Sequence, residues 1–307
     1  MLKYVLKRLW QTIPTTVGII LLAFILFNVI GGSPAETLLG KNATPEAIAA
    51  FNAKWGYDKP LSEQFLRFVF DIFRGQFGYS VEYQEPVAEV LKRGVWPSLS
   101  LTVPILLGSV FVALSLSLVA AAYRGRFADK AILLCSTVVM SVNYVIWVLA
   151  GQFFLSYKAG FFPVWGYENA TFLLLPVLIG IISSLGADVR FFRSAILDEI
   201  YRPYVLAVRA KGVSGWFIMT RHVLRNSLIP VVTYVSLSIP YLFTGSLLLE
   251  GFFGIPGLGS VSINAIHSSD MAVVRAVVVI GALLYQFVNL AADVIYAWLD
   301  PRVRLDL

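Results

Sequence analysis

The chain has 307 residues, of which 58% are hydrophobic and only 14% are charged, and its formal net charge is +6. This composition is typical of a membrane protein, because so few polar residues cannot cover the surface of a soluble domain of this size. The single cysteine, Cys135, excludes a disulfide framework within the chain, and the two histidines, His222 and His267, are expected on opposite sides of the membrane.

Six charge-poor segments are long enough to cross a bilayer, whose apolar core of about 30 Å needs roughly 20 helical residues. The first run is too long for a signal peptide and no A-x-A cleavage site follows it, so an uncleaved span is expected. The sequence therefore predicts an all-α polytopic membrane protein with six transmembrane helices. We place them near residues 9–31, 98–122, 131–156, 170–187, 229–250 and 273–297.

Basic residues gather in alternate connections between these spans. Lys3, Lys7 and Arg8 precede the first span, three basic residues lie within 124–130, and seven lie between the fourth and fifth spans. The positive-inside rule places these segments, and both termini, in the cytoplasm. Because topology explains the positive net charge, nucleic-acid binding need not be invoked.

The connection at 32–97 is too long to be a simple loop. Thr44 followed by Pro45 predicts a capped helix to about Ala53, and apolar residues at helical spacing predict a second helix over 61–73. A third helical piece is predicted over 87–93. Two interpretations of the amphipathic 61–73 stripe remain open: a cap on the membrane surface, or a docking surface for an external partner.

The least hydrophobic stretch, 188–225, holds seven basic residues against three acidic ones. Pro203 suits the first turn of a helix that ends near Gly212, and Ser214 is placed to cap a second helix. Because lipid cannot accommodate such a segment, we expect it to dock a soluble partner. Pro230 is expected at the entrance of the fifth span.

Ionisable residues are scarce within the predicted spans. Asp293 lies well inside one, and Asp188, Glu250 and Arg275 lie at span ends. This scarcity argues against a secondary transporter driven by Na⁺ or H⁺. The glycine-rich patch at 251–259 is too irregular to face lipid, so we expect it to be buried in protein or to line a cavity.

The chain is not expected to be an enzyme or to bind a cofactor itself. It has no zinc-ligand spacing, no phosphate-binding loop ending in Lys-Ser/Thr, and no paired nucleophile and base in the spans. If it moves a solute, the energy is expected to come from another subunit.

Several segments spread over the whole length carry a family resemblance: LKYVLKRLWQTIPT, YDKPLSEQFLRF, RGQFGYS, EPV, RFFRSAILDEI, RAKGVSGWFIMTRHVLRNSLIPVVTY, LLEGFFGIPGLG and ADVIYAWLDPRVR. Together they resemble the B-type inner-membrane permease of ATP-binding-cassette (ABC) importers for dipeptides, oligopeptides and nickel. The resemblance implies the MetI-like permease fold of type I importers, with a cytoplasmic coupling helix.

In that family the loop after the fourth span carries the EAA motif, whose coupling helix docks into a groove on an ATPase subunit. The matching positions here are Ala207, Arg209, Ala210, Lys211 and Gly212, followed by Arg221, His222, Arg225, Asn226 and Pro230. The residues themselves add Ser214, with Trp216 and Phe217 as apolar anchors. Leu206 stands where the motif has glutamate, and Pro203 replaces the acidic residue usual before Tyr204.

Aromatic and hydroxyl side chains in the third and fifth spans suit a permissive passage for variable side chains. The candidate substrate-pathway residues are Asn143, Tyr144, Tyr234, Ser238 and Tyr241. Asn143-Tyr144 stands where the family commonly has Pro-Ser. Helix packing is an equally open interpretation for each aromatic residue. A metal ion would favour acidic or histidine ligands along its route, and the spans offer few.

The expected organisation has four parts: residues 1–31 with the first span, an extracytoplasmic helical loop at 32–97, a five-helix permease core at 98–299 that includes the coupling loop 188–228, and a cytoplasmic tail at 300–307. The resemblance implies half of a heterodimeric pore in the inner membrane, working with a second permease, two cytoplasmic ATPases that bind ATP and Mg²⁺, and an extracytoplasmic binding protein. The expected substrates are di- and oligopeptides. Nickel or another small solute is the alternative, and a self-contained secondary carrier is a more distant one.

Overall fold

The computed structural model describes residues 2–31, 33, 35, 39, 40, 43–239, 242 and 246–299, with side chains from Arg8 to Ala291. In these residues the chain is nearly all helical, and its β-structure is a single antiparallel bridge between Tyr79 and Pro86. The chain divides into two compact units. Unit 1 comprises the described parts of Met1–Ser98, Phe243–Gly251 and Pro256–Leu307, and unit 2 comprises those of Leu99–Leu242 and Phe252–Ile255. The predicted tail at 300–307 lies outside the described residues.

Four helical segments in the described part are long and apolar enough to cross a membrane alone. They are Arg8–Ile30, formed by α1 (Leu2–Phe24) and the π-helical turn η1 (Ile25–Ile30); α5 (Val87–Ala122); α8 (Thr171–Ile200); and Met271–Ala291 within α15 (Met271–Leu299). The number reaches six, as predicted, when each of two bent helix pairs is taken as one span.

The first bent pair falls where a straight third span was expected. Helix α6 (Phe127–Ser141) ends, and α7 (Tyr144–Gly151) with η2 (Gln152–Lys158) leaves at 90°. Val142 is extended, and Oδ1 of Asn143 accepts a 2.9 Å hydrogen bond from the Val145 N–H. The bend arises because the asparagine side chain caps a new helix start inside the apolar run.

The second bent pair is α13 (Leu247–Phe253) and α14 (Leu258–His267), which meet at 83° around the glycine-rich patch. A fifth span over 229–250 was expected, but the described helix there is α11 (Leu224–Ser236). Pro230 lies inside α11 and not at its entrance. The rest of that predicted span falls partly on residues 240, 241 and 243–245, which lie outside the described residues.

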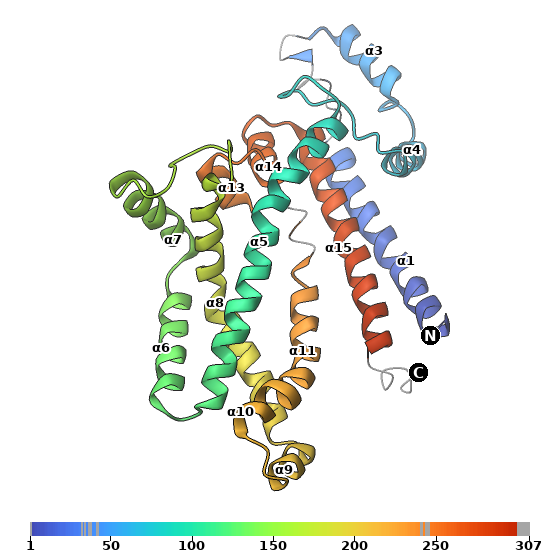
Figure 1. Ribbon diagram of the computed structural model, residues 1–307. Coiled ribbons are helices and arrows are strands. Elements are labelled where there is room, and N and C mark those ends of the chain that lie inside the picture. The colour runs from blue at the N-terminus through green and yellow to red at the C-terminus, as the bar shows by residue number, and fades with distance from the viewer. Residues whose placement is uncertain are drawn as a thin grey trace. The chain divides into compact units, whose positions relative to one another are not determined.

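In unit 1, α1 and α15 lie side by side (Figure 1), and Gln286 donates a 2.9 Å hydrogen bond to the Thr15 hydroxyl across them. Helix α4 (Leu61–Phe73) has the predicted bounds and packs on both. Its Phe65 and Phe68 rings lie 5.3 and 5.8 Å from the ring of Phe24. The predicted amphipathic stripe is therefore used for packing inside the protein.

Two further elements of the long loop differ in how well the sequence predicted them. Helix α3 (Pro45–Trp55) starts as expected, because Oγ1 of Thr44 accepts a hydrogen bond from the Ala47 N–H. The predicted pieces at 87–93 and 98–122 are one continuous helix, α5. Its first turns are held by Val87 and Val90, which are buried in a cluster with residues of α14 and α15.

In unit 2, α6 and α11 both pack on α8 (Figure 1). Phe192 of α8 is fully buried in a cluster with Val231 of α11. Arg193 of α8 forms a two-point ion pair with the buried Asp129 of α6, with N···O distances of 2.7 and 2.8 Å. This pair fixes the end of α6 beside the part of α8 that leads into the basic loop.

Candidate functional site

The basic loop folds as the sequence predicts around one glycine. Helix α9 (Pro203–Ala210) begins with proline at its first position, and Gly212 follows it with φ = +76°. A Cβ at Gly212 would meet no atom within 4 Å. The position therefore needs glycine for its backbone conformation and not for space.

After Gly212 the chain forms α10 (Gly215–Phe217) and η3 (Ile218–Val223), which lead into α11. Ser214 occupies the predicted N-cap position, but its hydroxyl makes no capping hydrogen bond, so this part of the prediction was wrong. Asn226 donates a 2.8 Å hydrogen bond to the Tyr204 hydroxyl and so ties α11 to α9. Burial raises the pKa of the Tyr204 hydroxyl.

We call residues 201–226 the basic lobe. Its underside is apolar: Val205, Ile218 and Val223 are buried against Ile196 of α8. A compact lobe seated on the end of a long helix transmits a push on its outer face to that helix, because close-packed groups are nearly incompressible.

The outer face of the basic lobe carries the predicted coupling residues. Ten of the eleven are exposed: Ala207, Arg209, Ala210, Lys211, Gly212, Ser214, Trp216, Phe217, Arg221 and Arg225. His222 is half-buried, with its ring 6.0 Å from that of Phe217. Among the described residues no carboxylate lies within 4.0 Å of the charged groups on this face, apart from Glu199 beside Arg202 at the rim. The exposed surface of the basic lobe thus carries cationic residues together with two exposed aromatic side chains.

The candidate pathway residues that the structure describes make contacts within unit 2. Asn143 caps α7, and the Tyr234 hydroxyl donates a 2.9 Å hydrogen bond to Asp188, with its ring stacked 4.6 Å from that of Phe191. Tyr144 and Ser238 are half-buried, and Tyr241 lies outside the described residues. For Asn143 and Tyr234 the contacts seen are structural ones.

Sequence reasoning missed a buried carboxylate cage at the second bend. Glu250 is fully buried, and its Oε1 accepts hydrogen bonds from the Ser98 hydroxyl (2.8 Å) and the Ser246 N–H (3.0 Å). Its Oε2 accepts from the N–H groups of Gly259 (2.7 Å) and Ser260 (3.1 Å) in the first turn of α14. The carboxylate therefore caps α14 from the preceding helix.

The same cage explains two glycines of the 251–259 patch. A Cβ at Gly257 would lie 2.4 Å from both Glu250 Oε2 and Ser98 Oγ, and a Cβ at Gly259 would lie 2.9 Å from Oε2. Both glycines are needed because the carboxylate passes so close to the backbone. The prediction that this patch is buried in protein is confirmed for Phe253, Ile255, Gly257, Leu258 and Gly259, whereas Gly251, Phe252 and Pro256 are exposed. The acid directly before the glycine-rich patch was the signal in the sequence.

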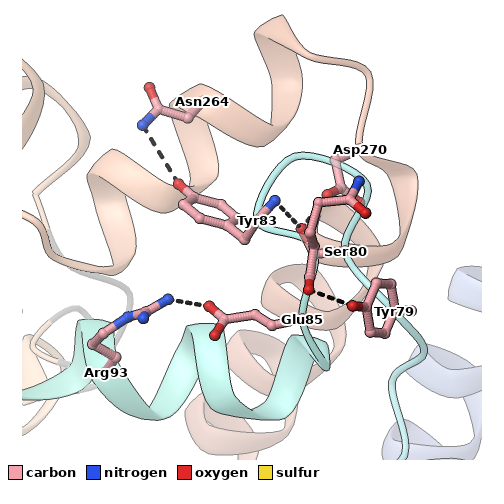
Figure 2. A network of polar contacts seen from close by, with 8 residues as sticks. Tyr79, Ser80, Tyr83, Glu85, Arg93, Asn264 and Asp270 are labelled. Carbon is pink, nitrogen blue, oxygen red and sulfur yellow. Dashed lines mark hydrogen bonds and ion pairs between the residues drawn. The ribbon is translucent and has the colours of Figure 1, made fainter.

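A second buried carboxylate, Asp270, anchors the loop at residues 79–86 (Figure 2). Its Oδ2 accepts hydrogen bonds from the Ser80 hydroxyl (2.6 Å) and from the N–H groups of Val81 (2.9 Å) and Glu82 (3.2 Å). Its Oδ1 accepts a 3.3 Å bond from the Val273 N–H in the first turn of α15. Aspartate before an apolar helix is a capping signal that sequence reasoning overlooked.

The loop held by Asp270 is closed on its other sides as well. Tyr79 and Pro86 form the β-bridge, and Asn264 of α14 donates a 3.5 Å hydrogen bond to the Tyr83 hydroxyl (Figure 2). Glu85 pairs with Arg93 of α5. The surface formed by residues 79–86 is therefore built on α5, α14 and α15 together.

These features define a multi-pass membrane protein with a cationic lobe next to its spans. The family described as "Binding-protein-dependent transport system inner membrane component" matches residues 113–305, and "Binding-prot-dependent transport system membrane comp, N-term" matches residues 1–102. The chain belongs to this family and is a permease subunit of an ABC importer.

Two relatives and one solved structure are similar to the chain over most of its length. It is 34% identical over 310 residues to "Glutathione transport system permease protein GsiC" of Salmonella paratyphi A (strain ATCC 9150 / SARB42), and 32% identical over 313 residues to the protein of the same name from Escherichia coli (strain K12), with 99% of each chain covered in both cases. A structure titled "Inward facing conformations of the MetNI methionine ABC transporter" gives a TM-score of 0.55 at 20% identity, over 69% of this chain and 96% of that chain. This last likeness confirms the predicted fold class.

Proposed function

We propose that this chain forms half of the translocation pathway of an importer for small peptides, paired with a second permease. The observation that carries the proposal is 34% identity over 99% of the chain to a permease named for glutathione, which is a tripeptide. Relatedness over the whole length, and not in one motif, supports a substrate of the same chemical class.

In this proposal one of two cytoplasmic ATPases binds the outer face of the basic lobe, and the other binds the second permease. Trp216 and Phe217 are 54% and 49% exposed, which is unusual for aromatic residues on a charged surface that has no partner. Exposed aromatic and arginine side chains are typical anchors of protein interfaces. ATP and Mg²⁺ bind to those partner subunits, and this chain converts closure of the ATPases into motion of α8.

An extracytoplasmic binding protein delivers the substrate to the 32–97 side, and both termini lie in the cytoplasm. The positive-inside rule supports this orientation, since the basic lobe and the connection at 124–130 lie on the same side. Labelling single cysteines placed at Ser62 and Ser214 tests it. If the cysteine at position 62 reacted only from the cytoplasmic side, the topology would be the opposite of the proposed one.

Uptake by the complete reconstituted importer tests the function. Vesicles that contain both permeases, the ATPases and the binding protein should take up glutathione-sized peptides only when ATP is supplied to the ATPase side. Nickel uptake without peptide uptake would favour the alternative substrate. Uptake driven by an ion gradient without the ATPases would indicate a secondary carrier.

A further inference from the structure

A cavity of about 830 Å³ lies in unit 1 and takes no part in the proposed transport steps. Its walls come from η1 at the end of α1, from the first turns of α15, from α4, and from the loop at 75–81. Both α1–η1 and α15 are candidate membrane spans, so the cavity lies where two spans reach the membrane surface. Cavities of this size are typical of sites for small organic ligands.

One wall of the cavity is continuous with exposed apolar side chains of a candidate membrane span. Leu26 and Ile30 of η1 line it and are 45% and 73% exposed, although both belong to a candidate span. An occupant with alkyl chains would therefore extend from the cavity along the exposed apolar side chains of η1.

The other wall supplies a cation. The Arg275 guanidinium donates one hydrogen bond, of 3.3 Å, to the Phe77 carbonyl and lies 5.7 Å from the Phe68 ring. No carboxylate of the described residues lies within 4.0 Å of it. A guanidinium has five N–H donors, so donors remain for an anionic oxygen. The second cation in the lining, Arg67, is already bound to the Trp55 carbonyl and lies 3.9 Å from Asp71.

The lining also contains a polar group without a partner. Oδ1 of Asn28, in the π-helical turn η1, is buried, and no donor of the described residues reaches it. Buried polar atoms are nearly always hydrogen-bonded, and π-helical turns are frequent at functional sites. A hydroxyl or ammonium donor on an occupant that reached the amide of Asn28 would satisfy it.

We propose that this cavity binds one phospholipid from the leaflet on the side of the 32–97 loop. Arg275 binds the phosphate, the Asn28 amide meets a donor of the headgroup, and the acyl chains run along η1. A phospholipid combines these three groups, and the apolar wall opens toward the bilayer that supplies it. The bound lipid would fill the space between α4 and the two spans.

Native mass spectrometry of the full-length chain, purified in its native assembly and reconstituted in nanodiscs, tests the proposal. The wild type should retain one phosphatidylethanolamine or phosphatidylglycerol per chain after the bulk lipid is stripped, and should not retain diacylglycerol with the same acyl chains. Arg275→Gln should lower retention about fivefold, as expected for one interfacial arginine–phosphate contact. Arg275→Lys, which keeps the charge, should lower it less.

Two further variants keep the result interpretable. Arg74→Gln is the matched control, because Arg74 lies on the exposed end of α4 and outside the cavity lining. Met271→Trp narrows the cavity from a position that is 55% exposed and so tolerates a large side chain. It should also lower retention. Any of three results would overturn the proposal. They are unchanged lipid retention in both Arg275→Gln and Met271→Trp, equal retention of diacylglycerol by the wild type, and a bound peptide in place of the lipid.

Discussion

The Ser98 hydroxyl donates a 2.8 Å hydrogen bond to Glu250 and at the same time accepts a 2.7 Å bond from the Leu258 N–H. One hydroxyl thus joins the buried carboxylate to the first residue of α14. With the two N–H groups that Oε2 accepts from, three backbone donors of the α14 start are satisfied by a pair of side chains from α5 and α13. The 83° bend is held by this pair.

Glu250→Gln should therefore destabilise the protein by about 1–3 kcal/mol, because the amide presents N–H groups to donors on one side of the cage. Ser98→Ala should lower the free energy of unfolding by about 1 kcal/mol. Thermal unfolding in detergent measures both changes, and Glu89→Gln, at an exposed position on α5, serves as the control. If Glu250→Gln melted at the temperature of that control, the cage would contribute nothing to stability.

Asp270 has two structural roles that one substitution separates. In Asp270→Asn the new amide still caps α15 through its one oxygen, since asparagine caps helices as well as aspartate does. The variant loses the acceptor for Ser80, Val81 and Glu82, so residues 79–86 should exchange amide hydrogens faster while α15 keeps its protection. Hydrogen exchange measures this difference. Equal protection of the loop in wild type and variant would show that Asp270 does not anchor it.

Gly212 and Gly215 form a matched pair for the coupling proposal. Both positions are exposed and would accept a Cβ without meeting any atom within 4 Å, but only Gly212 has a positive φ. An alanine at position 212 should be less stable than glycine in this left-handed backbone conformation by about 1–2 kcal/mol. Gly212→Ala should therefore lower ATPase retention by up to about tenfold, whereas Gly215→Ala should leave it unchanged. Co-purification measures retention, and equal values for the two variants would contradict the role of Gly212.

Helix α4 offers a test that separates packing from docking. Phe68 is 7% exposed and Phe70 is 59% exposed on the same helix. Phe68→Asp buries a charge without a partner and should cost at least about 3 kcal/mol. Phe70→Asp should leave unfolding unchanged within about 0.5 kcal/mol. Loss of transport in Phe70→Asp with normal stability would favour a docking or membrane-contact role for the exposed face, and normal transport would exclude that role.

Local signals in the sequence predicted the elements that local chemistry controls. Helix α4, the start of α3 at Thr44 and the turn at Gly212 follow from spacing, capping and backbone preference. The errors arise where contacts between residues far apart in the sequence determine the structure. The α5 helix runs on from 87 because Val87 packs on α14 and α15, and hydropathy alone does not show that contact.

The missed carboxylates have the same cause. Glu250 and Asp270 appear in the sequence only as acids at the ends of spans. Their partners, Ser98 and Ser80, are 152 and 190 residues away. The bend at Asn143 was open to prediction, since asparagine is a strong capping residue, but the apolar run around it favoured a continuous span.

The distance between Ser80 and Asp270 along the chain has a consequence for biosynthesis. A ribosome adds about 5–20 residues per second, so roughly 10–40 s separate the synthesis of the two bonded residues. In the proposed topology the 79–86 segment crosses the membrane during that interval without its anchor. Unit 2 lies almost wholly within one continuous stretch and can complete its packing first, whereas unit 1 must wait for the last helix. Nascent chains arrested before residue 270 should therefore be cut by protease within 79–86, and release of the finished chain should end that sensitivity.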